Sequence, residues 1–368
     1  PRRAMDDSKR NEKSVVICGG GVIGCATAYY LSLKGVNATV IERVQVAACA
    51  SGKAGGFLAA DWGSVGSLGA KSFALHAQIA EDLSSVDFGY RRVETISISS
   101  NAVGAKGKSS KGDWIDGPVQ SESVLGTPET TAQVHPRLFT KAILESAISR
   151  GASLKIANVV DVVIENGAVT GVRTDDGTTT PADVVVIAMG PWSGIARKWF
   201  PQMTNVTGRK AHSITIRPNC PIPAQVLFTH IVTKTRFTAD PEIYCRPDGE
   251  VYVCGMSTRS KLPENPADVK PSEGQCQKLQ EVSGSLCSCL SAENAKIEVE
   301  QACFLPQVED FSGQPMIGKI PGVSGAYLAA GHTCWGILNA PATGLALSEL
   351  IVDGKCSTFD LRPFDPSR

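Results

Sequence analysis

VVICGGGVIG, at residues 15–24, is the stretch that decides the fold, because an apolar run enters a glycine-rich turn and a second apolar segment follows. Gly19, Gly21 and Gly24 fill the pattern G-x-G-x-x-G, which in a strand–turn–helix unit binds the diphosphate of a dinucleotide. The first glycine permits a tight turn, the second lets a diphosphate approach the backbone, and the third lets the helix lie close to the strand. The helix N-terminus would also direct free N–H groups and a partial positive charge at the phosphates. We therefore expect a dinucleotide-binding β-α-β unit.

A second strand is expected over residues 38–42, whose sequence ATVIE ends on the acid Glu42. This acid follows the glycines at about 20 residues, the usual distance at which a carboxylate accepts hydrogen bonds from ribose hydroxyls and repels a 2′-phosphate. The small residue Ala28, and Gly35 at the expected end of the helix, extend the pattern beyond its short form. The motif indicates a bound dinucleotide, but by itself it does not separate FAD from NAD.

The composition limits the classes to which the protein can belong. Its 368 residues suggest about two domains, and 42% hydrophobic residues permit a large core. The formal net charge is zero, which argues against nucleic acid or a strongly charged membrane as a partner. We find no apolar run of about 18 or more residues that would span a bilayer. The first 13 residues are polar and charged, without the apolar centre of a signal peptide. We therefore expect a cytoplasmic protein, or an organellar one if a targeting segment precedes Pro1.

The chain has 12 cysteines, but their spacing forms neither a disulfide framework nor a metal site. Cys18, Cys25 and Cys303 stand in apolar or strand-like surroundings, where cysteine behaves as a small hydrophobic residue. Cys287 and Cys289 form C-x-C without a second pair at metal-ligand spacing. We therefore expect reduced thiols and no bound metal.

The rest of the chain reads as strand–glycine–helix regions separated by a β-rich insert. Residues 183–190, DVVVIAMG, form a continuous apolar run that ends on Gly190, as a central parallel strand does. Residues 326–330 form a strand that enters the turn GHTCWG at residues 331–336, and a helix is expected to follow. The region from about 205 to 300 alternates between polar and apolar residues, which indicates a largely antiparallel sheet. The expected fold is α/β, with a Rossmann-like domain built from discontinuous segments and a second domain with a mainly antiparallel sheet.

Five segments, in this order, resemble the D-amino-acid oxidase-like family of FAD-dependent oxidoreductases, which includes glycine, sarcosine and D-amino-acid oxidases. They are residues 19–24 together with Glu42, and residues 50–56, 185–192, 242–249 and 331–338. The resemblance implies FAD as the cofactor. The closing strand–glycine–helix supports FAD independently, because a second helix N-terminus would stabilise negative charge on the reduced flavin. We assign an FAD-binding domain to residues 14–60, 135–200 and 300–368, and a substrate domain to residues 61–134 and 201–299.

The resemblance also implies which residues hold the cofactor. The diphosphate would lie at Gly19, Gly21, Val22, Ile23 and Gly24, and the adenosine at Glu42, Arg43 and the backbone of Val159 or Val160. Ser51, Gly52 and Lys53 would lie along the flavin. Gly190, Gly331, His332, Gly336, Ile337 and Leu338 would complete the site around the isoalloxazine.

The implied reaction is oxidation of the C–N bond of an amine or amino acid. A hydride passes from the carbon that bears the amine to flavin N5, the imine hydrolyses in water, and oxygen re-oxidises the flavin to give hydrogen peroxide. Lys53, His332 and Trp335 are the expected catalytic residues. Lys53 would place a cation near the flavin and assist oxygen reduction, although a lysine in a glycine-rich loop is usually solvated. His332 would polarise the flavin or contact substrate, although a structural hydrogen bond to backbone is an equal alternative.

One segment departs from the family pattern at a position that binds substrate. Amino-acid oxidases of this family often carry Gly-Leu-Arg-Pro, whose arginine holds the substrate carboxylate, whereas residues 303–306 read Cys-Phe-Leu-Pro. Leu305 cannot donate a hydrogen bond, and a carboxylate buried against it would be unpaired. Either another cation such as Arg246 or Arg259 replaces that arginine, or the substrate is not a simple α-amino acid. We expect a secondary or N-substituted amine.

Three alternatives remain open at the level of sequence. Cys303 lies near the position where sarcosine-oxidase-type members attach flavin through a cysteine sulfur, although a buried strand cysteine is the simpler interpretation. A quinone or a protein carrier could replace oxygen as the electron acceptor, which would make the enzyme a dehydrogenase. A flavin-stabilised protein whose main role is to bind partners, for instance in trafficking, is the non-enzymatic alternative. The oligomeric state is not predicted.

Overall fold

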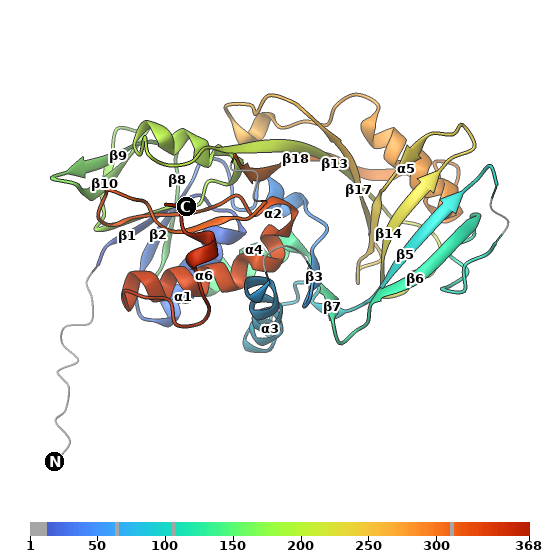
Figure 1. Ribbon diagram of the computed structural model, residues 1–368, viewed down its shortest axis with the longest axis horizontal. Helices are drawn as coiled ribbons and strands as arrows, with labels where there is room; N and C mark the ends of the chain where they lie inside the picture. The colour runs from blue at the N-terminus through green and yellow to red at the C-terminus, as the bar shows by residue number, and fades with distance from the viewer. Residues whose placement is uncertain (1–12, 63–65, 105–106, 310–312) are drawn as a thin grey trace, which may run out of the picture.

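The computed structural model describes residues 13–62, 66–104, 107–309 and 313–368. Two regions lie side by side along the long axis of the molecule (Figure 1). One is built on a mainly parallel sheet covered by several helices, and the other is built on a larger, mainly antiparallel sheet.

The parallel region contains a six-stranded sheet with the order β19-β20-β12-β1-β2-β8. Its strands are β1 (Val15–Cys18), β2 (Ala38–Glu42), β8 (Ser153–Ile156), β12 (Val184–Ile187), β19 (Met316–Lys319) and β20 (Ala326–Ala330). All neighbouring strands are parallel except β19 and β20. Every residue of β1 and β12 is buried, as expected for strands covered on both faces. Segments from distant parts of the chain therefore build one Rossmann-like sheet, and the expected fold class is confirmed.

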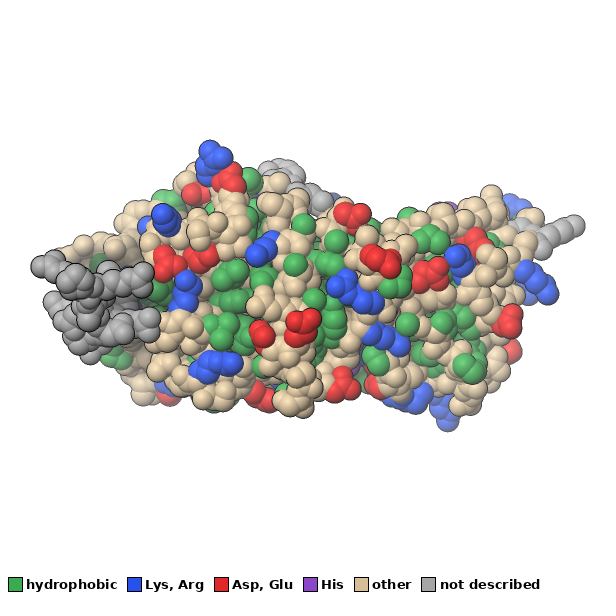
Figure 2. Space-filling view, turned by 90° about the horizontal axis from the view of Figure 1, so that it is seen from below, with side chains coloured by type: hydrophobic (Ala, Val, Ile, Leu, Met, Phe, Trp, Pro, Cys, Tyr) green, Lys and Arg blue, Asp and Glu red, His purple; other side chains and the backbone are tan. Residues whose placement is uncertain are grey.

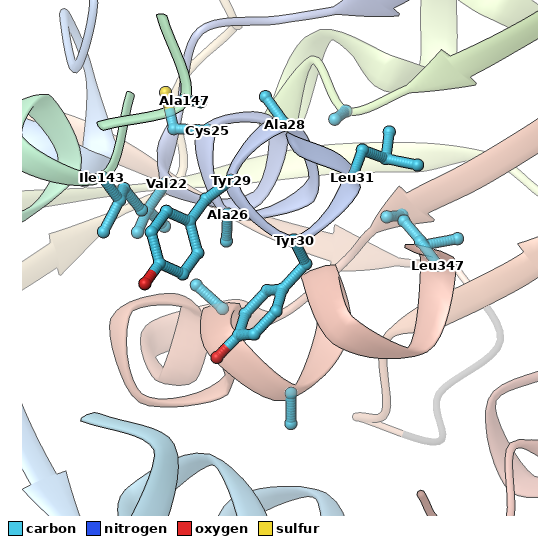
Figure 3. Close-up of a cluster of buried hydrophobic side chains, with 14 of the residues drawn as sticks. Val22, Cys25, Ala26, Ala28, Tyr29, Tyr30, Leu31, Ile143, Ala147 and Leu347 are labelled. Carbon is cyan, nitrogen blue, oxygen red and sulfur yellow. The ribbon is translucent and has the colours of Figure 1, made fainter. Parts of the chain in front are cut away.

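Four helices belong to this region: α1 (Val22–Leu33), α3 (Ser67–Asp82), α4 (Pro136–Ile148) and α6 (Gly336–Val352). Figure 3 shows side chains of α1, among them Tyr29 and Leu31, beside Ile143 of α4 and Leu347 of α6. Helices α1 and α6 touch through their backbones, because a Cβ atom at Gly344 would lie 2.5 Å from the carbonyl carbon of Ala26. Their N-termini follow β1 and β20, whose carboxyl ends lie at the same edge of the sheet.

Helix α6 and the turn before it form an apolar segment that the sequence analysis did not find. Thr333–Val352 is long and apolar enough to cross a membrane, and it is the one such helix in the described part of the chain. In the structure 72% of this segment's apolar window is buried, and α6 packs against α1 and α3. The position of α6 in the core accounts for its apolar composition.

The second region contains an eight-stranded sheet with the order β18-β13-β17-β16-β14-β5-β6, in which β15 pairs with β14. Its strands are β5 (Glu94–Asn101), β6 (Val119–Gly126), β13 (Val206–Ile216), β14 (Gln225–Val232), β15 (Thr238–Ala239), β16 (Glu242–Cys245), β17 (Val251–Thr258) and β18 (Ile297–Val308). Only β14 and β5 are parallel neighbours. Helix α5 (Gln275–Leu286), which the sequence analysis did not predict, packs Leu279 among buried residues of this sheet such as Ile243. A Ser-Gly-Ser run near its end weakens the helical signal.

Smaller elements complete the fold. One three-stranded sheet comprises β9 (Val159–Glu165), β10 (Ala168–Thr174) and β11 (Thr179–Pro181), and another comprises β3 (Phe57–Ala59), β4 (Arg91–Arg92) and β7 (Thr131–Gln133). The short helical segments are α2 (Ala50–Lys53), η2 (Gly190–Lys198), η3 (Pro266–Asp268), η4 (Ser288–Leu290), η5 (Thr333–Trp335) and η6 (Arg362–Phe364). The domain boundaries given above stay a prediction. Strand β18 pairs with β13 as far as Val308, so the chain leaves the large sheet only after this residue, whereas the last predicted FAD-binding segment begins at residue 300.

The surface carries both signs of charge. On the face seen in Figure 2, the Lys and Arg side chains drawn in blue are interspersed with the Asp and Glu side chains drawn in red. No extended patch of one sign covers the coloured part of this face, which agrees with the formal net charge of zero.

Candidate active site

A cavity of about 610 Å³ extends between the parallel sheet and the large antiparallel sheet. Its walls come from the turn between β1 and α1, the end of β2, the start of α2, the start of η2, several strands of the large sheet and the turn before α6. The glycine fingerprint and the closing turn GHTCWG therefore face the same space, although they are distant in the sequence.

The glycine turn has the geometry that its sequence predicts. Gly19 has a φ of 116°, and a Cβ atom there would overlap with the carbonyl oxygen of Ala188. A Cβ atom at Gly24 would overlap with the carbonyl oxygen of Gly19, and Gly24 itself does not line the cavity. Gly21, the residue before α1, lines the cavity, and a Cβ atom there would meet only Ser51 Oγ, at 3.1 Å. Gly19 thus shapes the turn, Gly24 permits close packing, and the open side of Gly21 leaves room for a ligand.

The expected adenosine end contains Glu42 and Arg43, both of which line the cavity. The Glu42 carboxylate is held by two backbone N–H donors: Gly20 donates to Oε2 at 2.7 Å and Val44 donates to Oε1 at 2.9 Å. Arg43 Nε donates to Asn158 Oδ1 at 2.6 Å. Each Glu42 oxygen keeps acceptor capacity for a ribose hydroxyl.

Two residues named for the adenine lie on opposite sides of one strand. Val159 lines the cavity with Ala157 and Asn158, whereas Val160 is 44% exposed and is not part of the lining. Successive side chains of a strand alternate between its faces, so only one of the two side chains can face the cavity. The contact of adenine with the backbone there stays a prediction.

The turn before α6 brings a second helix N-terminus to the cavity. Ala330, His332, Trp335, Gly336 and Ile337 line it. Neither α1 nor α6 has an acidic residue in its first turn or a side-chain hydrogen bond from its N-cap residue. Both helices therefore direct their positive ends towards one cavity, without an acidic residue in either first turn. This arrangement, together with the glycine cradle, fits the diphosphate and the anionic reduced ring of the FAD that the resemblance implies.

Two residues named for the isoalloxazine support this turn without lining the cavity. Gly331 has a φ of 85°, and a Cβ atom there would overlap with Val308 Cγ2. Leu338 is 1% exposed and belongs to the core between the helices. Gly190, by contrast, lines the cavity at the start of η2.

The three residues expected along the flavin belong to the helical turn α2, and only one of them lines the cavity. Ser51 lines the cavity, and its Oγ accepts a hydrogen bond from the backbone N–H of Val22 at 2.9 Å. Gly52 and Lys53 are not part of the lining. The Lys53 ammonium donates to the carbonyl oxygen of Ala302 at 3.0 Å, and a Cβ atom at Gly52 would overlap with the carbonyl oxygen of Ala47. The catalytic role of Lys53 stays a prediction.

His332 lies in the cavity wall as an uncharged side chain. It is 2% exposed, and its Nε2 lies 3.1 Å from Thr343 Oγ1 of α6. Burial lowers the pKa of His332 to about 3, so the imidazole is neutral at physiological pH. The hydrogen bond to Thr343 holds the ring in place. Its role in catalysis stays a prediction.

Beyond Trp335, the cavity ends among aromatic side chains that the sequence analysis did not single out. They are Phe57, Phe228, Tyr244 and Tyr252, and the acid Glu242 lies with them in the lining. Phe57 and Phe228 have their ring centroids 5.2 Å apart, and Tyr244 and Tyr252 lie 5.6 Å apart. A sequence signal for part of this set exists, because Glu242 and Tyr244 are two residues apart on β16 and therefore share a face.

The substitution at the carboxylate-binding position lies in the cavity wall. Leu305 lines the cavity, whereas Arg246 and Arg259 do not. Arg246 is 5% exposed, forms an ion pair with Glu250, and lies over the Tyr252 ring at 5.1 Å. Arg259 is exposed. Neither candidate arginine therefore lies in the cavity wall, where it could replace the carboxylate-binding arginine that is absent at position 305.

Cys303 also lines the cavity, and burial raises the pKa of its thiol to about 12. Within the ranges that the structure describes, no group of three or more His, Cys, Asp or Glu side chains could hold a metal ion.

Comparison with known proteins identifies the family. The model of the family described as "FAD dependent oxidoreductase" (DAO) matches residues 14–350. A protein of Schizosaccharomyces pombe that is named as an oxidoreductase is 32% identical, over 97% of this chain and 98% of its own length. Glycine oxidase from Bacillus subtilis is 27% identical, over 97% of each chain.

Solved structures agree with this match. The crystal structure of glycine oxidase from Geobacillus kaustophilus has a TM-score of 0.81 and 25% sequence identity, and it covers 97% of this chain and 98% of that chain. The resemblance stated from the sequence is therefore confirmed. The chain belongs to the DAO family of FAD-dependent oxidoreductases, and it is an enzyme whose cofactor is FAD.

Proposed function

We propose that the enzyme oxidises the C–N bond of a small amine or amino acid and that oxygen is its electron acceptor. The observation that carries this proposal is the single cavity that joins the Gly19–Gly24 turn to the aromatic end, with the N-terminus of α6 between them. The glycine oxidases among the relatives support an amine as the reacting group.

Bound FAD would supply the acceptor for a hydride from the carbon that bears the amine; the imine would then hydrolyse in water, and oxygen would take up the electrons as hydrogen peroxide. The chain's own residues would hold and orient the cofactor and the substrate. Glu42 would hold the ribose and the α1 N-terminus the diphosphate. The α6 N-terminus would stabilise negative charge at the ring, where preorganised N–H groups need no reorganisation.

The aromatic end would hold the substrate. Phe57 and Tyr252 are 8% and 3% exposed, so they would enclose an apolar substituent and keep water from the reacting carbon. Leu305 offers no donor to a substrate carboxylate. These features favour an amine whose binding does not depend on a carboxylate, such as a secondary or N-substituted amine.

The test is an anaerobic screen of the purified, FAD-loaded protein. Loss of the flavin absorbance on mixing with a panel of primary amines, secondary amines and amino acids reports reduction without any assumption about the acceptor. We expect at least one amine to bleach the flavin, and oxygen to restore the absorbance with hydrogen peroxide as product. A flavin that no member of the panel bleaches would refute the proposal. Bleaching without re-oxidation by oxygen would refute the oxygen acceptor alone.

A further inference from the structure

The aromatic end of the cavity carries charges of one sign. Asp240 and Glu242 line it, and among the described lining residues Arg43, at the opposite, adenosine end, is the only lysine or arginine. His212 and His332 also line the cavity, and burial lowers the pKa of both, so they are neutral at physiological pH. Asp240 is the more exposed of the two acids, and its Oδ1 lies 2.6 Å from His230 Nδ1. A ligand at this end therefore meets two carboxylates and no lysine or arginine of the described cavity wall.

Glu242 has an unused acceptor. Its Oε2 accepts hydrogen bonds from the Tyr244 hydroxyl and, at 3.5 Å, from Cys254 Sγ. Both of these hydrogen bonds are on Oε2, so Oε1 keeps its acceptor capacity among the described residues, and Glu242 forms no ion pair with any of them. Burial raises the pKa of Glu242, and the hydrogen bonds from Tyr244 and Cys254 offset this only in part. A cationic ligand would supply the remaining compensation.

Aromatic side chains line the same end of the cavity as this carboxylate. The ring centroids of Phe57 and Tyr244 lie 6.2 Å apart, and those of Phe228 and Tyr244 lie 6.4 Å apart. Trp335 packs against the same cluster from the turn before α6. Aromatic faces attract ammonium ions and repel carboxylates, and rings of this size also bury apolar substituents.

We infer that this end of the cavity binds the ammonium group of a monoamine that carries no carboxylate, with the nitrogen against Glu242 and an apolar or aryl substituent among Phe57, Phe228 and Tyr244. The inference deepens the proposed function and rests on it for the reaction, but not for binding. A substrate carboxylate would face Glu242 and Asp240 without a donor at Leu305. The cavity therefore selects for the cation and against the zwitterion.

The first test measures binding without turnover on the FAD-loaded protein. Benzyltrimethylammonium is a permanent cation that has no N–H group or lone pair and cannot be oxidised to an imine. Benzyl alcohol and phenylacetate are its neutral and anionic counterparts. Titration followed by the flavin absorbance gives each Kd. We expect the cation to bind about 10-fold or more tightly than either counterpart. Phenylacetate binding as tightly as the cation would overturn the inference.

Glu242→Gln tests the named residue. We expect this variant to bind benzyltrimethylammonium about 10-fold more weakly and benzyl alcohol equally well. Glu298→Gln is the matched control, because it makes the same acid-to-amide change on β18, where Glu298 pairs with Arg217 at the surface. We expect it to leave both Kd values unchanged. Unchanged cation binding in Glu242→Gln would overturn the inference. If this variant does not retain FAD, the ligand series on the unmodified protein decides alone.

The second test compares substrates that differ by one carboxylate. Benzylamine and N-methylbenzylamine are compared with phenylglycine as anaerobic reductants of the flavin. We expect the amines to reduce it about 100-fold faster or more. Reduction by phenylglycine at an equal rate would overturn the ammonium-only site and leave the proposed function standing. Binding of the cation without bleaching by any amine would refute the proposed function and leave the binding site standing.

Discussion

The carboxylate of Glu42 accepts a hydrogen bond from the backbone N–H of Gly20 at 2.7 Å. The acid that ends β2 and the glycine turn that follows β1 are therefore one unit. The Glu42 side chain also lies against the turn, and only a glycine fits at position 20 without a shift, because an added Cβ atom there would lie 2.9 Å from Glu42 Cβ. The predicted recognition of ribose and the geometry of the phosphate turn would therefore depend on the same carboxylate.

Replacing this acid should weaken FAD binding. Glu42→Gln keeps the size of the side chain but removes the charge that accepts hydrogen bonds from Gly20 and Val44. Hydrogen bonds to charged groups contribute about 1.5–3 kcal/mol, so we expect the Kd for FAD to rise about 10- to 100-fold. Reconstitution of the apoprotein, followed by flavin fluorescence, measures it. Glu165→Gln, an exposed change on β9, is the control, and equal Kd values for the two variants would contradict the prediction.

A methyl group at Gly24 should disrupt the turn. The added Cβ atom of Gly24→Ala would overlap with the backbone carbonyl oxygen of Gly19, which cannot rotate away. Overpacking of this kind costs about 1–3 kcal/mol, so we expect a Tm lower by several degrees and a lower FAD content. Gly104→Ala is the matched control, because its Cβ atom would meet nothing closer than Asn101 Nδ2 at 3.8 Å. A Tm for Gly24→Ala equal to that of the control would refute the proposed clash.

The features that the sequence predicted correctly are those encoded at fixed local spacing. Strand β1, helix α1 and strand β2 lie where the sequence predicted them, because a strand–turn–helix unit has nearly invariant dimensions. The placement of Lys53 away from the cavity was not predicted, because α2 is one helical turn and rotates residues two apart to different sides. Val160 and Val159 differ by one strand position, which local sequence does not resolve.

The aromatic end was missed for a different reason. Phe57 belongs to β3, Phe228 to β14 and Glu242 to β16, so their proximity depends on strand pairings that the sequence does not specify. The cluster becomes visible only when β16 pairs with β14 and both face the turn before α6.

Acid should destabilise the protein partly through His332. Its pKa is about 3 when folded and about 6.5 when unfolded, so between these values the unfolded chain binds a proton that the folded chain does not. Stability therefore rises with pH across this window, by up to about 1.4 kcal/mol per pH unit, and the contribution is complete above it. Tm measured from pH 4.5 to 7 should fall less steeply on acidification in His332→Asn. His230→Asn, at an exposed histidine, should keep the original slope, and an unchanged slope in His332→Asn would contradict the prediction.

FAD should be bound without a covalent link to Cys303. The thiolate is the reactive form of cysteine, and burial, with a contribution from Cys49, raises the pKa of this thiol to about 12. Precipitation of the holoenzyme with trichloroacetic acid should leave a white pellet and a yellow supernatant. The same outcome is expected for Cys303→Ser. A yellow pellet that turns white in Cys303→Ser would demonstrate the attachment that the sequence left open.

Oxygen reactivity should not depend on Lys53. Its ammonium donates to the carbonyl oxygen of Ala302 at 3.0 Å, and the hydroxyl of Tyr252 donates to the Lys53 carbonyl oxygen at 2.7 Å, so both ends of the residue are held by hydrogen bonds behind the cavity wall, and Lys53 is not part of the lining. A cation must approach the ring closely to stabilise developing negative charge there, because solvent and distance weaken its field. In Lys53→Met the rate of re-oxidation by oxygen, measured by stopped-flow after anaerobic reduction, should stay within about 2-fold of the original, less than 1 kcal/mol in the barrier. A tenfold slower re-oxidation, with FAD content unchanged, would show that the ammonium leaves Ala302 and acts at the flavin.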